Sequence, residues 1–384
     1  MKRTRFLASA LSLASLLTVH ASTFANTEPF KPEVMSVEKA ISPGPNVLVN
    51  EASWDGASKI HVYGQADMAY KGLMSLGLTS QFIISKDGSK AYALSDYMKR
   101  YTYGPIESVL QVFDIKTLSP IQEIIVPNKI AKAIGMTGLI EASADEKYLY
   151  LQNATPATSV TVVDLSAGKV LTEVPTPGCY GIYPSLSGYA FSTLCGTGQA
   201  RTYTLTGDQY STATSDKFFD VDSDALYIHA QRTSAGKLVF TSFNGNLYLV
   251  DDSSDTFKLA EKIEVSKGVE GNWAPGGYAI SAYNSANDVL FMIMHPDAYE
   301  GSHKDGSKEI WAYSLKEHKL ISRSAAEHLV AIAVTQDKEP KIFGSNEDEE
   351  TADEYTLSSA KDFTFTKAAS DSKAGWTTSL LVTP

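Results

Sequence analysis

The sequence predicts an all-β fold, namely a seven-bladed β-propeller closed by pairing of its N- and C-terminal strands. Strand-like runs separated by polar turns recur along the chain in seven copies, spaced by about 49 residues. Apart from the N-terminal segment and a short stretch at 265–271, no apolar stripe of helical period is visible. Repeats of roughly 40 to 50 residues built from strands alone are typical of propeller blades, which bury each other's faces around an axis.

Each repeat contains two recognisable elements. The first is a strand-like run, a polar turn and a second run, and its copies begin at Ile60, Leu110, Val160, Ala200, Leu247, Ile310 and Asp353. The second is a polar turn followed by an apolar run, and it begins at Ser85, Ser143, Ser234, Asn284 and Thr335. Since Val, Ile, Tyr and Phe favour strands, each unit is expected to form several short antiparallel strands.

Closure of a ring requires the two ends of the chain to share a blade. The run NVLVNE from Asn46 and the run TSLLVTP from Thr378 are both extended and apolar, as such a shared blade requires. The alternative architecture, two consecutive β-sandwich domains, would need a linker near the middle of the chain. The Gly- and Pro-containing stretch at 175–178 leads directly into a cysteine and is no such linker.

Residues 1–25 have the layout of a secretory signal peptide. Lys2, Arg3 and Arg5 precede an apolar run at 6–19, and small residues follow it. Residues 26–45 are then an N-terminal extension, and residues 46–384 are the propeller. The signal predicts export, which in a bacterium means the periplasm.

Charge and hydropathy exclude two classes of partner. The chain has 33 Lys and Arg against 44 Asp and Glu, a formal net charge of −11, whereas a nucleic-acid binder needs a basic surface. No run after the signal approaches the ~18 apolar residues of a membrane span. We therefore expect neither a nucleic-acid partner nor a membrane span.

The chain has two cysteines, Cys179 and Cys195. In an oxidising compartment they most simply form a disulfide with each other. A redox-active or metal-ligating pair is the less favoured alternative, because the C-x-x-C spacing is absent.

The common catalytic signatures are absent: there is no G-x-S-x-G, no H-E-x-x-H and no phosphate-binding loop. The densest polar cluster is the segment MHPDAYEGSHK, whose candidate residues are His295, Asp297, Glu300, His303 and Lys304. Three interpretations stay open: an ordinary inter-strand loop, a partner-binding loop and, least favoured, a divalent-metal site.

Two further segments carry aromatic residues at turns. In GNWAPGGY the turn residues Pro275, Gly276 and Gly277 follow Asn272 and Trp273, and this Trp is either a lid over the core or an interface anchor. Trp54 lies in the polar loop NEASWDGAS, where it either packs locally or contacts a ligand or partner.

These motifs together resemble one family. The runs LQNATPATSVTVVDL from Leu151, GCYGIYP from Gly178, NWAPGGY from Asn272 and MHPDAYEGSHK before EIWAYS occur in order over most of the chain. They resemble the large (heavy) subunit of the tryptophan-tryptophylquinone amine dehydrogenases, and look closer to aromatic amine dehydrogenase than to methylamine dehydrogenase. One departure is the loop at 102–111, where Pro105, Ser108 and Gln111 replace charged positions of the family pattern.

The resemblance implies a role without catalytic residues in this chain. A separate small subunit would carry the tryptophan tryptophylquinone cofactor, and two large and two small subunits would form a heterotetramer. The complex would oxidise a small primary amine to an aldehyde and ammonia, with a blue-copper protein as electron acceptor. The large subunit would dock the small one and line the substrate channel, and Trp54 lies where the family places an aromatic gate of that channel.

Two other functions remain as alternatives. One is a stand-alone periplasmic propeller that binds a ligand or scaffold partner without redox chemistry. The other is a single-chain propeller enzyme with its site at the mouth of the central channel, which is least favoured because no convergent acid, base and nucleophile can be identified.

Overall fold

The structure is a computed structural model that describes residues 36–101, 103–131 and 135–384. The predicted signal peptide (1–25) and residues 26–35, half of the predicted extension, lie outside the described residues. Residues 39–384 form one compact unit, and the description that follows concerns this unit.

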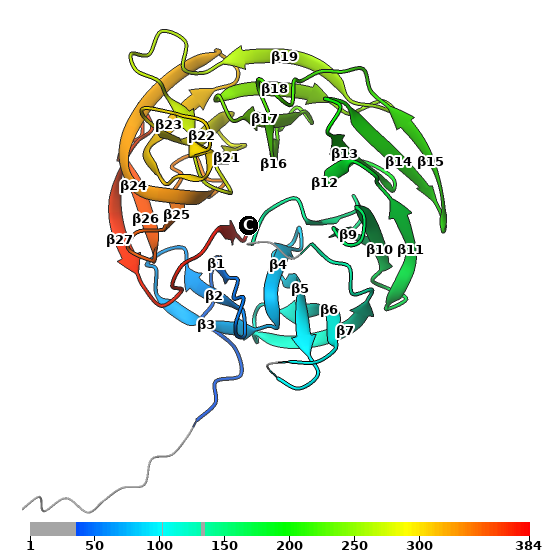
Figure 1. Ribbon diagram of the computed structural model, residues 1–384. Helices are drawn as coiled ribbons and strands as arrows, with labels where there is room; N and C mark the ends of the chain where they lie inside the picture. The colour runs from blue at the N-terminus through cyan, green and yellow to red at the C-terminus, as the bar shows by residue number, and fades with distance from the viewer. Residues whose placement is uncertain (1–35, 102, 132–134) are drawn as a thin grey trace, which may run out of the picture. The chain divides into compact units, whose positions relative to one another are not determined.

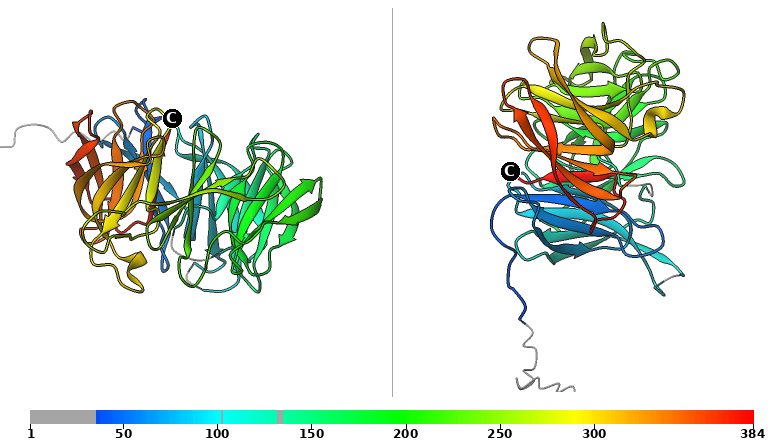
Figure 2. Two further views of the ribbon diagram at one scale, coloured as in Figure 1. Left: turned by 90° about the horizontal axis from the view of Figure 1, so that it is seen from above. Right: turned by 90° about the vertical axis from the view of Figure 1, so that its left-hand side faces the viewer.

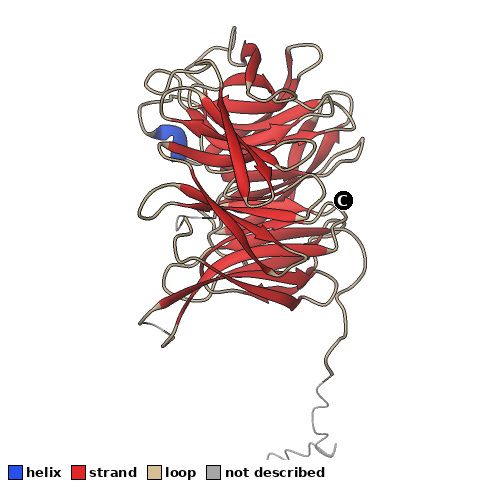
Figure 3. Cartoon of the chain, turned by 90° about the vertical axis from the view of Figure 1, so that its right-hand side faces the viewer, coloured by secondary structure: helices blue, strands red, loops and turns tan. Residues whose placement is uncertain are grey.

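The unit is a ring of antiparallel β-sheets arranged around a central axis (Figure 1), and the inner strands of five of these sheets border a central channel. In the sheets of Figure 1 the strands follow one another outward from the channel, as β16 to β19 do, and the next sheet begins again at the centre. Apart from one short 3-10 helix, η1 (Ser302–Lys304), the described elements are strands (Figure 3). The all-β prediction is therefore confirmed.

Five sheets have four strands each, and we number them blades 1 to 5 in the order in which they follow one another along the chain. Blade 1 contains β1 (Asn46–Glu51), β2 (Lys59–Gly64), β3 (Tyr70–Ser75) and β28 (Ser379–Val382). Blade 2 contains β4 (Leu78–Ile84), β5 (Lys90–Met98), β6 (Ile106–Asp114) and β7 (Ser119–Val126). Blade 3 contains β8 (Ile140–Ala142), β9 (Tyr148–Asn153), β10 (Ser159–Asp164) and β11 (Lys169–Pro175).

The second half of the ring holds two more blades and a larger sheet. Blade 4 contains β12 (Cys179–Pro184), β13 (Ala190–Cys195), β14 (Ala200–Thr206) and β15 (Gln209–Thr214). Blade 5 contains β16 (Leu226–Arg232), β17 (Leu238–Ser242), β18 (Asn246–Asp251) and β19 (Lys258–Glu264). The remaining sheet contains β20 (Ala274–Pro275), β21 (Ser281–Asn284), β22 (Val289–His295), β23 (Ser307–Ser314), β24 (Lys319–Val334), β25 (Ile342–Asn346), β26 (Thr351–Ser359) and β27 (Thr364–Asp371).

The prediction of seven separate blades is wrong. The described residues form five four-stranded blades, and the repeats that begin at Ile310 and Asp353 share one eight-stranded sheet. The reason is β24, a strand of 16 residues that pairs with β23 over its first part and with β25 over its last. Its sequence has no Gly or Pro to end the strand; instead His328 adopts a positive φ of 43° and bends it without breaking it.

Closure by the two ends of the chain is confirmed. Strand β28 pairs with β1 in antiparallel register from Val47↔Val382 to Asn50↔Ser379, and β1 pairs with β2 on its other edge. Beyond the strand, the backbone N–H of Thr383 donates to the carbonyl oxygen of Asn46 at 2.9 Å. The C-terminal residues therefore supply the innermost strand of blade 1.

The core lies between neighbouring sheets. The second strands of the sheets are covered on both sides, so β9 is buried along its whole length, whereas the outermost strand β15 is almost entirely exposed. Between blades 3 and 4 the rings of Tyr150 and Phe191 have centroids 5.0 Å apart, and Phe191 stacks on Tyr203 at 5.2 Å. Seen from the side in Figure 2, the strands of the sheets run between the two ends of the ring.

The closing strand gives a test of the fold. Leu380 is 1% exposed and packs against Val49 and residues of the eight-stranded sheet, whereas its neighbour Leu381 borders the channel and is partly exposed. Leu380→Ala is expected to lower the free energy of unfolding by about 2–5 kcal/mol, because it leaves a cavity at the closing seam. Leu381→Ala is the matched control and should cost clearly less. Chemical denaturation of both variants measures the difference, and equal costs would contradict the assigned register.

Candidate functional site

The sequence-predicted site residues lie at one end of the ring. The sheets are antiparallel, and the strands of each sheet are counted outward from the channel. The loop from the second to the third strand and the loop from the outermost strand to the next sheet therefore lie at the same end of the ring. These connections include 52–58 after β1, 265–273 after β19 and 296–306 after β22. We call this end the Trp54 end, and the opposite end, where the chain terminates, the Pro384 end.

Trp54 projects from the connection between β1 and β2. The backbone N–H of Ser53 donates to Ser58 Oγ at 3.0 Å, and the N–H of Gly56 donates to Ser53 Oγ at 3.1 Å. The carbonyl oxygen of Ser53 accepts a hydrogen bond from the N–H of Thr79 at 2.8 Å, which ties the loop to blade 2. The loop is thus held by its small polar residues, and the Trp54 side chain is left 57% exposed.

The two other predicted segments contact each other. Asn272 Nδ2 donates to the carbonyl oxygen of Ala298 at 2.6 Å, and the N–H of Ala298 donates back to Asn272 O at 2.9 Å. The N–H of Gly277 donates to the carbonyl oxygen of His303 at 3.1 Å. Segments 272–277 and 295–304 therefore form one structural unit, which the sequence alone did not indicate.

The glycines of this unit allow two backbones to meet. A β-carbon at Gly276 would lie 2.2 Å from the carbonyl oxygen of Asp305, and one at Gly277 would lie 2.4 Å from that of Val330. Gly277 also has a φ of +120°, which disfavours other residues. Trp273 closes the unit from the side: its ring lies against Trp311, with centroids 5.4 Å apart, and beneath the Arg323 guanidinium at 4.3 Å. Trp273 is thus placed as a lid over the core.

The two histidines of the unit do not converge. His303 stacks on Phe243 with centroids 4.1 Å apart, and burial lowers its pKa so that the neutral ring is favoured. His295 is buried, and its Nδ1 lies 3.0 Å from the carbonyl oxygen of Pro296. Asp297 and Glu300 are exposed, as is Lys304. The described residues do not bring these groups together as metal ligands; the described cluster whose ligand atoms could meet a metal is His328, Glu347 and Asp348.

The disulfide prediction is confirmed. Cys179 and Cys195 are bonded to each other and lie opposite one another on β12 and β13, with Cα atoms 3.9 Å apart. Beside the bridge, the N–H of Gly196 donates to the carbonyl oxygen of Gly178 at 3.0 Å. The bridge therefore fixes the start of blade 4 at the Trp54 end.

Sequence reasoning missed other aromatic residues at this end. Tyr101 and Tyr103, in the connection between β5 and β6, are 93% and 63% exposed, and Tyr299 in the 296–306 connection is 65% exposed. Tyr299 is held by a hydrogen bond from its hydroxyl to Asp305 Oδ2 at 2.8 Å. Their only signal in the sequence is a tyrosine in a turn-rich loop, which does not distinguish an exposed ring from a packed one.

A family model and curated proteins match this chain. Residues 47–371 match the model of the methylamine dehydrogenase heavy chain (MADH). The methylamine dehydrogenase heavy chain of Methylorubrum extorquens is 28% identical over 275 residues, which span 70% of this chain and 66% of that protein. The heavy chain of Methylophilus methylotrophus is 23% identical over 288 residues, which span 73% of this chain and 70% of the relative. The chain thus spans about two thirds of the length of these relatives.

Solved structures share the fold at low sequence identity. A protein from Desulfotomaculum acetoxidans has a TM-score of 0.59 at 10% identity, over 89% of this chain and 99% of that one. The Swd1 β-propeller domain of Myceliophteria thermophila has a TM-score of 0.56 at 10% identity, over 84% of this chain and all of that one (100%). These likenesses concern the propeller fold alone. None of the helices among the described residues has the length and apolar character to cross a membrane.

The close backbone contact at Gly276 gives a second test. Gly276→Ala is expected to destabilise the protein by about 1–3 kcal/mol, because the added methyl group meets the Asp305 carbonyl and the two backbone segments must separate. Gly196→Ala is the control, since a β-carbon there has its nearest neighbour at 3.8 Å and φ is not positive. Thermal unfolding of both variants provides the measurement. A Gly276→Ala variant as stable as the control would mean that the two segments do not meet as described.

Proposed function

The chain belongs to the methylamine dehydrogenase heavy chain family, and from this premise we propose that it is the large subunit of a periplasmic amine dehydrogenase. In this proposal a separate small subunit carries the tryptophan tryptophylquinone cofactor and the catalytic groups. Two large and two small subunits form a heterotetramer. The complex oxidises a primary amine to an aldehyde and ammonia, and a blue-copper protein accepts the electrons.

The observation that carries the docking role is the set of exposed aromatic residues at the Trp54 end. Of the exposed aromatic side chains among the described residues, only Tyr210 does not belong to this set of four, which consists of Trp54, Tyr101, Tyr103 and Tyr299. Trp and Tyr are enriched among the residues that dominate binding energy at protein interfaces. We propose that the small subunit docks on this end.

The polar residues of the same end support a docking role over a catalytic one. His303 is stacked and His295 is buried, while Trp273 is covered by Arg323. His295 Nδ1 lies against the carbonyl oxygen of its neighbour Pro296, and the backbone carbonyl of His303 accepts from the N–H of Gly277, so the two rings are not arranged as an acid and a base around a substrate. In the proposed complex these residues hold the docking loops in place, and Trp54 gates the amine channel at the subunit boundary.

Reconstitution tests the proposal directly. The chain purified alone should show no quinone absorbance and no amine oxidation. Co-expression with a cysteine-rich small subunit encoded nearby should yield a complex of two large and two small chains that reduces a blue-copper protein in the presence of a primary amine. Amine turnover by the isolated chain, or failure of any such small chain to bind it, would refute the proposal.

Trp54 allows the docking surface to be tested by substitution. Trp54→Ala is expected to weaken binding of the small subunit by about 2 kcal/mol, or about 30-fold in Kd, because it removes a large exposed ring from the proposed interface. Tyr210→Ala is the matched control, since Tyr210 is 40% exposed but lies on an outer strand of blade 4. Surface plasmon resonance with the small subunit gives both values. Equal values for the two variants would place the interface elsewhere.

The choice of amine is a separate prediction. The relatives found are methylamine dehydrogenase heavy chains, whereas the sequence motifs favour a closer likeness to aromatic amine dehydrogenase. Comparing kcat/KM of the reconstituted complex for methylamine and for an aromatic primary amine decides between the two. If Trp54 gates the channel, Trp54→Ala should change KM for the larger amine more than for methylamine.

A further inference from the structure

The central channel contains a cavity of about 520 Å³. Its walls come from the inner strands of the five blades, and they include apolar side chains of Ile83 on β4, Ile182 on β12 and Leu381 on β28. A smaller cavity of about 160 Å³ adjoins it and shares the residues Thr137, His229 and Gln231. A space of this size and lining suits a small organic molecule.

Residues 135–138, which we call the plug, belong to the connection between β7 and β8 and lie across the channel on the side of the Trp54 end. The carbonyl oxygen of Gly135 accepts a hydrogen bond from Thr378 Oγ1 beside blade 1 at 2.6 Å. Two residues further on, Thr137 Oγ1 contacts His229 Nδ1 on blade 5, and the carbonyl oxygen of Gly138 accepts from the N–H of Ile182 on blade 4 at 2.9 Å. The plug therefore spans the ring, and the cavity opens toward the Pro384 end, where Ser85, Leu186 and Pro384 line it.

Two acidic residues line this cavity, namely Glu146 near its mouth and Glu141 on β8. Glu141 lines the wall just beyond the plug, and its carboxyl accepts a hydrogen bond from the backbone N–H of Gly138. Burial raises the pKa of Glu141 to about 8, although the charge of Arg232 and the Gly138 hydrogen bond act in the opposite direction. Among the described residues no side chain forms an ion pair or hydrogen bond with this carboxyl.

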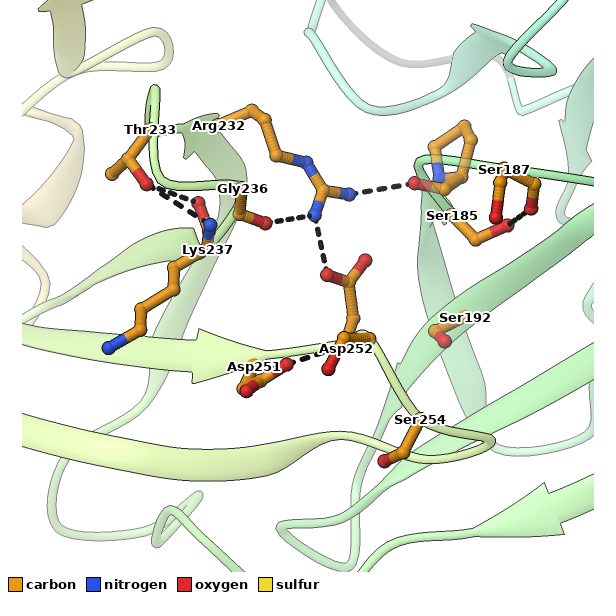
Figure 4. A network of polar contacts seen from close by, with 12 residues as sticks. Ser185, Ser187, Ser192, Arg232, Thr233, Gly236, Lys237, Asp251, Asp252 and Ser254 are labelled. Atoms are coloured by element: carbon orange, nitrogen blue, oxygen red, sulfur yellow. Dashed lines mark hydrogen bonds and ion pairs between the residues drawn. The ribbon is translucent and has the colours of Figure 1, made fainter.

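Arg232 does not neutralise Glu141 because its guanidinium is bound elsewhere. One of its terminal nitrogens donates to Asp252 Oδ1 at 2.6 Å and to the carbonyl oxygen of Gly236 at 2.8 Å; the other donates to the carbonyl oxygen of Pro184 at 2.8 Å (Figure 4). Figure 4 shows these partners surrounding the guanidinium at the junction of blades 4 and 5. Asp252 thus satisfies the arginine charge, and the Glu141 carboxylate is left without a counter-charge.

The other polar groups of the cavity are also occupied. Lys86 Nζ contacts the carbonyl oxygen of Ala144, and the hydroxyl of Tyr183 donates to Ile228 O at 2.8 Å. His229 Nε2 lies 2.6 Å from the carbonyl oxygen of Ser281, and burial lowers the pKa of this histidine, so it stays neutral. The cavity therefore combines an apolar wall with the Glu141 carboxyl, to which no described side chain gives an ion pair or a hydrogen bond.

We propose that this cavity binds a small organic ammonium ion, whose charge pairs with the Glu141 carboxylate while its apolar body contacts the channel wall. An anion is disfavoured because the carboxyl would repel it and Arg232 is already paired. Once the carboxyl ionises, near and above pH 8, an ammonium ion supplies the counter-charge that a neutral ligand lacks. This inference does not rest on the proposed function, since the cavity lies on the far side of the plug from the proposed docking surface.

The test uses cyclohexylammonium as the probe and cyclohexanol as its uncharged counterpart, with the full chain and isothermal titration calorimetry. The ammonium should bind and the alcohol should not. At pH 7 Glu141 is mainly protonated, so its pairing with the ammonium ion should release about one proton per ligand bound. The released proton is taken up by the buffer, so the measured heat of binding should change with the ionisation enthalpy of the buffer. Between pH 6 and pH 8 the affinity should rise as the carboxyl ionises.

Two variants assign the effect to one residue. Glu141→Gln should weaken binding by about 30-fold or more and abolish proton release, because it removes the charge partner. Glu146→Gln is the matched control: Glu146 also lines the cavity mouth, but its carboxylate accepts the backbone N–H of Lys86 at 2.7 Å. The other two groups with shifted pKa values stay neutral, because burial raises the pKa of Tyr183 and lowers the pKa of His229.

A stability measurement separates loss of binding from loss of folding. The pKa of Glu141 is raised in the folded state, so the folded chain holds the proton more tightly and stability is lost as pH rises toward and through 8. Glu141→Gln removes this loss and should be at least as stable as the parent at pH 9. Equal binding of cyclohexanol, retained affinity in Glu141→Gln, or no ammonium binding at millimolar concentration and pH 8 would each overturn the proposal.

Discussion

Pairing of β28 with β1 is the interaction on which the rest of the structure depends. It joins residues more than three hundred positions apart and completes blade 1 from the inside. The same seam packs Val47, Val49 and Leu380 against Ala331 and Phe343 of the eight-stranded sheet. Once the ring is closed in this way, every sheet has a neighbour on both faces, and the edges that remain are the outermost strands and the inner strands that line the channel.

Closure also explains the burial pattern along each sheet. Strands in the second position lie between two neighbouring sheets, so β22, with the sequence VLFMIMH, is buried at every residue. Outer strands such as β19 are exposed at most positions and carry Lys and Glu. A sequence search for strict two-residue alternation would therefore miss the most central strands, whereas the repetition of whole units identifies them.

The sequence was sufficient for features that depend on local chemistry or on repetition, namely the all-β class, the closing strands and the Cys179–Cys195 bridge. It was insufficient where hydrogen bonding between distant segments decides. Nothing local in SAAEHLVAIAV shows that β24 serves two repeats, because His328 bends the strand by its φ angle alone. Likewise Glu141 and Arg232 belong to repeats far apart in the chain and become neighbours only when the inner strands surround one channel.

The closed ring gives this protein two ends with different chemistry. At the Trp54 end four large aromatic rings are exposed on loops held by backbone hydrogen bonds. At the Pro384 end the channel leads to a carboxyl without a counter-charge. The plug separates the two, and its contacts with Thr378, His229 and Ile182 tie it to three blades at once. Because the plug lines the cavity and is held by three blades, a partner on the aromatic surface that shifted the plug would also reshape the cavity.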